Sequence, residues 1–155
     1  MSLYSIRQSR PSPPLLGTWK LNSVVRELLS TGEKHSLLGE HPSGYTGYSP
    51  DGRMYAIITA DKRLTPHDVA PTDEERVKLH RTIVAYAGTY SVEGEKVTHH
   101  VDISWNQAWN GTDLIRFYKL EGNTLTIKTG PLKSPIDGRQ GQVVVVWEKV
   151  KAPTQ

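Results

Sequence analysis

Short segments in which apolar and polar residues alternate, separated by turn residues, are the feature that most constrains the fold of this chain. Successive side chains point to opposite faces of a β-strand, so each such segment predicts a strand with one apolar face. In residues 15–29, for example, Trp19, Leu21, Ser23 and Val25 fall on one side of the expected strand. The expected strands lie within residues 15–29, 34–38, 43–49, 50–60, 89–94, 96–105, 112–123, 124–131 and 141–150.

Residues 71–88 break this pattern and predict a helix. Thr72 and Glu75 form the capping box of a helix N-terminus, and the acidic residues at positions 73 and 74 suit its positive end. Gly88 is suited to end the helix. We therefore expect one α-helix over about residues 73–87, and its broad apolar side predicts that it packs against the sheet. That side consists of Val77, Leu79, Ile83, Val84, Tyr86 and Ala87.

About nine strands with one inserted helix, and no internal repeat, predict an all-β, mainly antiparallel fold. Consecutive hairpins must stack as a sandwich or close as a barrel, and closure removes the exposed strand edges. We expect a barrel of eight to ten strands, with room inside for side chains and one small ligand. The barrel domain should span residues 15–150. A flexible, proline-containing segment at residues 1–14 should precede it, and a tail at residues 151–155 should follow it.

The composition excludes several classes of function. With 36% hydrophobic and 23% charged residues, the 155 residues fit one globular domain. The net charge of +3 comes from scattered Lys and Arg residues without a basic stripe, so we expect no nucleic-acid partner. We also expect no membrane partner, because no segment has the ~20 apolar residues of a membrane span. The absence of cysteine excludes disulfides and cysteine nucleophiles, and with no signal-peptide pattern it favours a cytoplasmic location.

Five segments resemble, in order and spacing, a known family. The segment "LLGTWKL", with Gly17 and Trp19, resembles the opening motif of the lipocalin superfamily. The long segment "THHVDISWNQAWNGTDLIRFY" is the most specific, and the others are "GYTGYSPDGRMYA", "AYAGTYSV" and "VVWEKV". Over residues 15–150 the chain thus resembles the small bacterial and fungal single-domain proteins of the lipocalin-like family.

This resemblance implies a lipocalin-like β-barrel with an internal cavity for a small, largely apolar molecule. It also implies that Trp19 plugs the closed end of the barrel and that Lys149 packs over this tryptophan. No single reaction is established for the family as a whole. The chain lacks the disulfide of many secreted lipocalins, so the resemblance does not extend to their extracellular carrier function.

Residues 97–112, "VTHHVDISWNQAWNGT", concentrate the chemical groups of the chain. One face of the expected strand is apolar except for His99 and should face the interior, so that His100 and Asp102 face solvent. The two adjacent histidines then point in opposite directions and cannot bind one metal ion. His100 and Asp102 have the spacing of two iron ligands, but no third ligand is evident, so we expect a solvated His–Asp pair and no metal site. The inward set is Val97, His99, Val101, Ile103 and Trp105.

His99 and Arg116 are the candidate chemical groups of the interior. A buried histidine forms a hydrogen bond to a hydroxyl or carbonyl and serves packing, or it contacts a ligand. Burial could also tune its pKa near neutrality for acid–base catalysis. In residues 113–120 each alternating set holds a charge and apolar groups, so the sequence leaves the orientation of Arg116 open. An inward Arg116 would need an acid, carbonyl groups or a ligand anion as its partner.

The segment that follows the strand at residues 96–105 should be a loop at the barrel mouth. Asn110-Gly111 predicts a turn, and Trp105 and Trp109 either line the entrance or serve ordinary loop packing. Tyrosine hydroxyls at positions 45, 48, 55 and 86 are further potential donors. The candidate catalytic residues are His99 and Arg116. The candidate ligand-binding residues are His99, Val101, Ile103, Trp105, Trp109, Arg116, Met54 and Tyr86.

Three functions from different classes fit these observations. The first is binding of a small, largely hydrophobic organic molecule that carries a carboxylate, phenol or carbonyl group. The second is a cofactor-free cyclase, isomerase or hydratase of a secondary metabolite, in which His99 and Arg116 handle proton transfer and oxyanion charge. The third is a structural or oligomerisation domain whose own side chains fill the cavity. No cofactor or metal is expected. The ligand, the open end of the barrel and the oligomeric state, with a homodimer as one alternative, are left undetermined.

Overall fold

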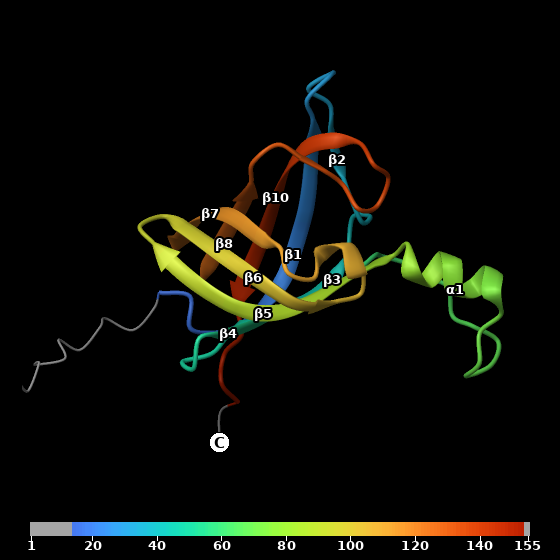
Figure 1. The fold of residues 1–155 in the computed structure, drawn as a ribbon, viewed down its shortest axis with the longest axis horizontal. Helices are drawn as coiled ribbons and strands as arrows, with labels where there is room; N and C mark the ends of the chain where they lie inside the picture. Colours follow the sequence, from blue (N-terminus) through green and yellow to red (C-terminus); the bar gives the residue numbers. More distant parts are fainter. Residues whose placement is uncertain (1–13, 154–155) are drawn as a thin grey trace, which may run out of the picture.

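One antiparallel sheet, closed into a barrel, forms the body of the protein (Figure 1). The computed structural model describes residues 14–153, so the segments expected at residues 1–13 and 154–155 lie outside the described residues. The barrel strands are β1 (Gly17–Leu28), β3 (Ser43–Tyr48), β4 (Arg53–Thr59), β5 (Ile83–Glu93), β6 (Lys96–Ser104), β7 (Asp113–Glu121), β8 (Thr124–Thr129) and β10 (Gln140–Lys149). They pair in this order, and β10 pairs with β1 to close the ring. This confirms the predicted all-β barrel.

Two short strands extend the sheet beyond the ring. Strand β2 (Lys34–Ser36) pairs with the last part of β1, and β9 (Leu132–Lys133) pairs with the first part of β10. Both therefore lie at the same end of the barrel, which is the upper end in Figure 1. The chain after β2 and the loop between β9 and β10 contribute lining residues of the interior at this end.

The opposite end of the barrel is closed by Trp19. Its side chain is 2% exposed, and its indole N–H donates to the carbonyl of Leu15 at 3.0 Å. The ammonium of Lys149 lies 4.7 Å from the centre of the indole ring and donates to the carbonyl of Leu16. Both the plug at Trp19 and the cover by Lys149 are thereby confirmed. This arrangement also identifies the end that carries β2 and β9 as the open one.

The predicted helix is present but shorter than expected. Helix α1 spans Asp73–His80 and begins with the predicted capping box between Thr72 and Glu75. The prediction that it continues to residue 87 is wrong, because the chain leaves the helix at Arg81 and enters β5 at Ile83. The β-branched pair at positions 83 and 84 favours a strand, and residues 83–89 pair with β4 along its whole length.

Helix α1 also does not pack against the sheet, contrary to the prediction. It has no buried residue, and it projects from the barrel body (Figure 1). Most of its predicted apolar side, from Ile83 to Ala87, belongs to β5 instead. Within residues 14–153 there is no helix long and apolar enough to cross a membrane.

Two β-bulges change which side chains face the interior. In β1 the extra residue is Asn22, since Leu21 pairs with Trp147 and Ser23 pairs with Val146. The alternation shifts there, so that Val24 is buried after the bulge at 4% exposure. The prediction that Ser23 and Val25 share the face of Trp19 is therefore wrong.

The second bulge lies in β6, where Asp102 is the extra residue. Val101 pairs with Gly88, and Ile103 pairs with Ala87. Val101 is buried at 3% exposure, whereas Ile103 is 62% exposed on the outside. The prediction that Ile103 faces the interior is wrong because the bulge reverses the alternation after Val101.

Replacement of Gly88 by alanine should destabilise the barrel strongly. A Cβ atom at Gly88 would lie 1.8 Å from the carbonyl oxygen of His100, so the bulged pair of β5 and β6 would have to separate. We expect the free energy of unfolding of Gly88→Ala to fall by more than about 2 kcal/mol, measured by urea unfolding. Gly130→Ala is the control, because its Cβ would meet no atom within 4 Å. Equal stability of the two variants would contradict the bulge geometry.

Candidate functional site

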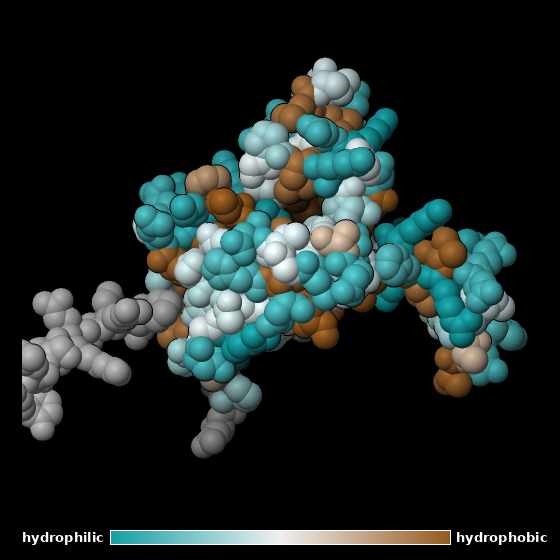
Figure 2. Space-filling view, in the orientation of Figure 1, coloured by the Kyte–Doolittle hydropathy of each residue, from teal (hydrophilic) through white to brown (hydrophobic). Residues whose placement is uncertain are grey.

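The barrel encloses a cavity of about 110 Å³ with mainly apolar walls. Loop residues at the open end complete its lining, including Leu37 and Leu38 near β2, and Trp109 in the short 3₁₀-helix η1 (Gln107–Trp109) between β6 and β7. The space-filling view shows a hollow with hydrophobic residues at this end (Figure 2). Its apolar walls include Val24, Ala56, Ile58, Val84, Ile127, Val143 and Val145.

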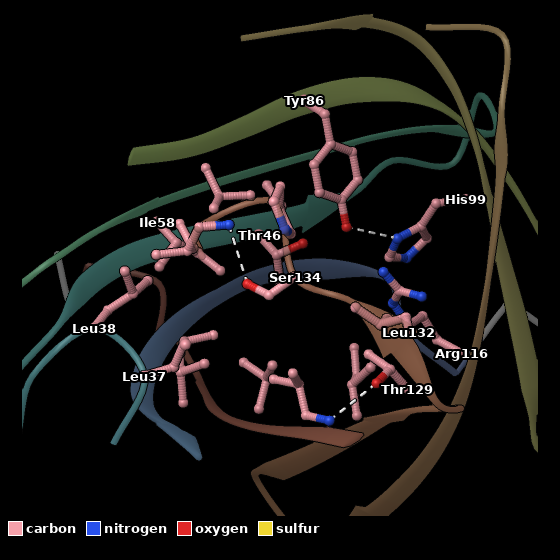
Figure 3. A pocket seen from close by; sticks show the side chains of 18 of the residues that line it. Leu37, Leu38, Thr46, Ile58, Tyr86, His99, Arg116, Thr129, Leu132 and Ser134 are labelled. Carbon is pink, nitrogen blue, oxygen red and sulfur yellow. Dashed lines mark hydrogen bonds between the residues drawn. The ribbon is translucent and has the colours of Figure 1, made fainter. Parts of the chain in front are cut away.

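His99 lies between two tyrosines at the wall of this cavity. Its Nε2 atom is 2.7 Å from the hydroxyl of Tyr48, and its Nδ1 atom is 2.9 Å from the hydroxyl of Tyr86. The three side chains come from β6, β3 and β5, and the Tyr86–His99 bond is drawn in Figure 3. His99 is only 3% exposed, so the prediction of an inward histidine bonded to hydroxyl groups is confirmed.

This Tyr48–His99–Tyr86 chain is uncharged at neutral pH. Burial, and then the electrostatic influence of Arg116 and His100, lower the pKa of His99 to about 3. Burial raises the pKa of both Tyr48 and Tyr86, so their hydroxyls stay protonated. A neutral imidazole has one donor and one acceptor nitrogen, and therefore one tyrosine donates to the ring while the other accepts from it. The pKa of about 3 does not agree with the alternative in which burial tunes the pKa of His99 near neutrality.

The structure places Arg116 on the inward face of β7. Its neighbours Ile115 and Phe117 are about half exposed, whereas the Arg116 guanidinium lines the cavity beside His99 (Figure 3). Its one hydrogen bond within residues 14–153 runs from Nη1 to the carbonyl of Ile115 at 3.2 Å, and it forms no salt bridge there. Burial lowers the pKa of Arg116, but a guanidinium remains charged. The cavity therefore contains a cation for which the described part of the chain supplies no acid.

The remaining predicted site residues lie in different places. Of these, Trp109 lines the cavity, and Trp105 packs edge-to-face on it with ring centres 5.0 Å apart. Met54 and Val101 are buried in the barrel but do not line the cavity, and Ile103 lies outside it. The structure thus brings His99, Arg116, Tyr86 and Trp109 of the eight candidates together around the cavity.

Sequence reasoning missed four polar residues of the lining, which are Thr46, Thr129, Ser134 and Trp147. Thr129 accepts a hydrogen bond from the backbone N–H of Val143 at 3.0 Å, and Ser134 accepts one from the N–H of Ile136 at 3.0 Å. Thr46 donates to the carbonyl of Tyr55 at 2.8 Å. Trp147 is 3% exposed, and its indole N–H has no partner among the described residues. The alternation of Leu125, Ile127 and Thr129 was a signal for Thr129, whereas Ser134 lies in a loop without such a pattern.

The outward groups of β6 form a polar surface instead of a site. His100 Nδ1 lies 2.7 Å from Asp113, and Asp102 binds the guanidinium of Arg53 at 2.6 and 3.2 Å. The expected pair between His100 and Asp102 is therefore wrong, although both face solvent as predicted. The hydroxyl of Ser91 lies 3.1 Å from His100 Nε2, which gives the order of a Ser–His–Asp triad. None of these groups lines the barrel cavity, and a triad without oxyanion donors or a substrate cleft is a poor catalyst.

The match to a family model agrees with this architecture. A family model described as the lipocalin-like domain matches residues 16–150, which include all strands of the barrel. Among solved structures, a lipocalin-like protein from Bacteroides uniformis ATCC 8492 matches with a TM-score of 0.45 and 13% sequence identity. The match covers 88% of this chain and 98% of that chain. No curated protein matches significantly.

The burial of His99 predicts a pH dependence of stability. Below pH 6.5 the unfolded chain binds a proton on His99, whereas the folded protein, with a pKa of about 3, does not. Stability should therefore fall as the pH is lowered from about 6.5 towards 4.5, by roughly 1.4 kcal/mol per pH unit. His99→Gln should remove this slope in urea unfolding, and the exposed His35→Gln should retain it. An unchanged slope in His99→Gln would contradict the assignment.

Proposed function

The chain belongs to the lipocalin-like domain family, and on this premise we propose that it binds a small, largely hydrophobic organic molecule in the barrel cavity. A carboxylate, phenol or carbonyl group of this ligand would face Arg116. The observation that carries the proposal is the guanidinium in the apolar cavity, which has no acidic partner within residues 14–153. A buried guanidinium without a partner is costly, so a ligand that supplies one is stabilised at this position.

The size of the cavity limits the part of the ligand that it encloses. An apolar cavity of roughly 150 Å³ is enough to hold benzene, and the cavity here measures about 110 Å³. The enclosed part is therefore about as large as a small ring or a short alkyl chain. The remainder of a larger ligand would lie at the open end, where Trp109 and Leu37 provide apolar contacts. Burial of apolar ligand surface contributes about 25 cal/mol per Å² to the binding free energy.

Binding is favoured over the alternative of a cofactor-free enzyme that uses His99 and Arg116. A histidine with a pKa of about 3 is a weak base at neutral pH. Both ring nitrogens of His99 are also occupied by the hydroxyls of Tyr48 and Tyr86. The alternative of a structural domain filled by its own side chains is less favoured, because the interior retains its cavity.

Filling the cavity should abolish binding. Val145 and Val144 are neighbours on β10, but Val145 lines the cavity whereas Val144 lies on the outer face. We expect Val145→Phe to lose binding of short lipophilic acids, alcohols and esters, and Val144→Phe to retain it. Ligand binding is measured by quenching of tryptophan fluorescence, and folding by circular dichroism. Native mass spectrometry of the purified wild type should also reveal any copurified small molecule.

Two results would contradict the proposal. One is equal binding by the two variants, which would place the ligand outside the barrel. The other is a wild-type protein that neither contains a copurified molecule nor responds to any compound of the panel. In that case the structural alternative would be preferred.

A further inference from the structure

Among the side chains that line the cavity, those whose chemistry allows only donation or only acceptance of hydrogen bonds are all donors. Among its lining residues there is no Asp, Glu, Asn or Gln, whereas Arg116 and Trp147 carry N–H groups only. The indole N–H of Trp147 has no partner within the described chain, and Arg116 uses its guanidinium for one backbone contact. A ligand group that accepts hydrogen bonds would satisfy these donors. An ammonium or amide N–H would meet only uncharged acceptors such as Thr46 Oγ1, whose own hydrogen is donated to the carbonyl of Tyr55.

Two hydroxyl groups of the lining, those of Thr129 and Ser134, agree with this direction. Thr129 lies opposite Arg116 in the register of β7 and β8. Its oxygen accepts from the N–H of Val143, so its own hydrogen is free to donate towards the cavity. The hydroxyl of Ser134 accepts from the N–H of Ile136 in the same manner. A group bound to Arg116 is therefore placed next to a further donor from β8.

The protein supplies a negative charge for one inward arginine but not for the other. Arg26 on β1 is 5% exposed, and its Nη1 lies 2.7 Å from the carboxylate of Asp137. For Arg116 the nearest titratable groups of the cavity are Tyr48, Tyr86 and His99, and none of them is negative at neutral pH. Arg116 thus lacks the partner that Arg26 has, within the part of the chain that the structure describes.

We infer that the ligand's enclosed polar group is a carboxylate, bound as an anion by the guanidinium of Arg116 with the hydroxyl of Thr129 beside it. This inference rests on the proposed function and narrows its three alternatives to one. A carboxylate matches the two parallel N–H groups of a guanidinium and compensates its charge. A phenol is neutral at pH 7, and a ketone or ester carbonyl also carries no charge, so both would leave Arg116 uncompensated.

Three probes with the same hydrophobic skeleton separate these cases: 4-phenylbutanoate, 4-phenylbutan-1-ol and 4-phenylbutylamine. Wild-type protein should bind the carboxylate about ten- to a hundredfold more tightly than the alcohol, because hydrogen bonds to charged groups contribute more than neutral ones. The amine should bind most weakly. Affinities are measured by isothermal titration calorimetry.

Variants of Arg116 test whether this side chain causes the preference for the carboxylate over the alcohol. Arg116→Met should lose the preference for the carboxylate over the alcohol, and Arg116→Lys should keep part of it. Circular dichroism shows that each variant is folded. Lys119→Met is the matched control, because Lys119 lies on the same strand with an exposed side chain paired to Glu121; it should keep the full preference.

The outcomes distinguish this inference from the proposed function. Equal affinities of wild type for the carboxylate and the alcohol would overturn the inference and leave the proposed function standing. A preference for the carboxylate that survives in Arg116→Met would also overturn it. If none of the three probes binds and the wider panel fails as well, the proposed function itself is contradicted.

Discussion

Nine paired positions join β1 to β10, from Trp19 with Lys149 to Leu28 with Gly141, and this pairing makes the interior a separate compartment. Without it, β1 and β10 would be open edges, and the inward faces of all eight barrel strands would adjoin solvent. The ring is closed at one end by Trp19, so the cavity communicates with water at the other end. Burial is the main cause of the low pKa of His99. This pKa therefore depends on the pairing of β1 with β10, although His99 itself lies on β6.

The strands, the turns and the closed barrel could be predicted from the sequence because alternation and turn residues are local signals. The bulges could not. Residues 101–105 keep a regular apolar alternation, and nothing in them marks Asp102 as an extra residue. What permits the bulge is on the partner strand, where Gly88 leaves room for the carbonyl of His100. The direction of Ile103 was therefore decided by a residue fifteen positions earlier in the chain.

Local signals and contacts with other strands also have to be distinguished for helix α1 and for the candidate site. The start of helix α1 was predictable because the capping box is a local pattern. Its end was not, because residues 83–89 pair with β4, and this pairing competes with the helix. In the site, the inward direction of His99 followed from its apolar neighbours. Its partners Tyr48 and Tyr86 come from two other strands, and the orientation of Arg116 followed only from the register of β7.

Arg116 and His99 influence each other through the same cavity. The positive charge of Arg116 is the second cause, after burial, of the low pKa of His99, and it disfavours an imidazolium beside it. A bound anion would offset this charge, and the pKa of His99 would then rise while the burial contribution remained. By linkage, an anionic ligand that raises this pKa must itself bind more tightly when His99 is protonated. The neutral Tyr48–His99–Tyr86 chain thus adds no second positive charge at neutral pH. Among the described residues that line the cavity, Arg116 is the one cation that a ligand meets.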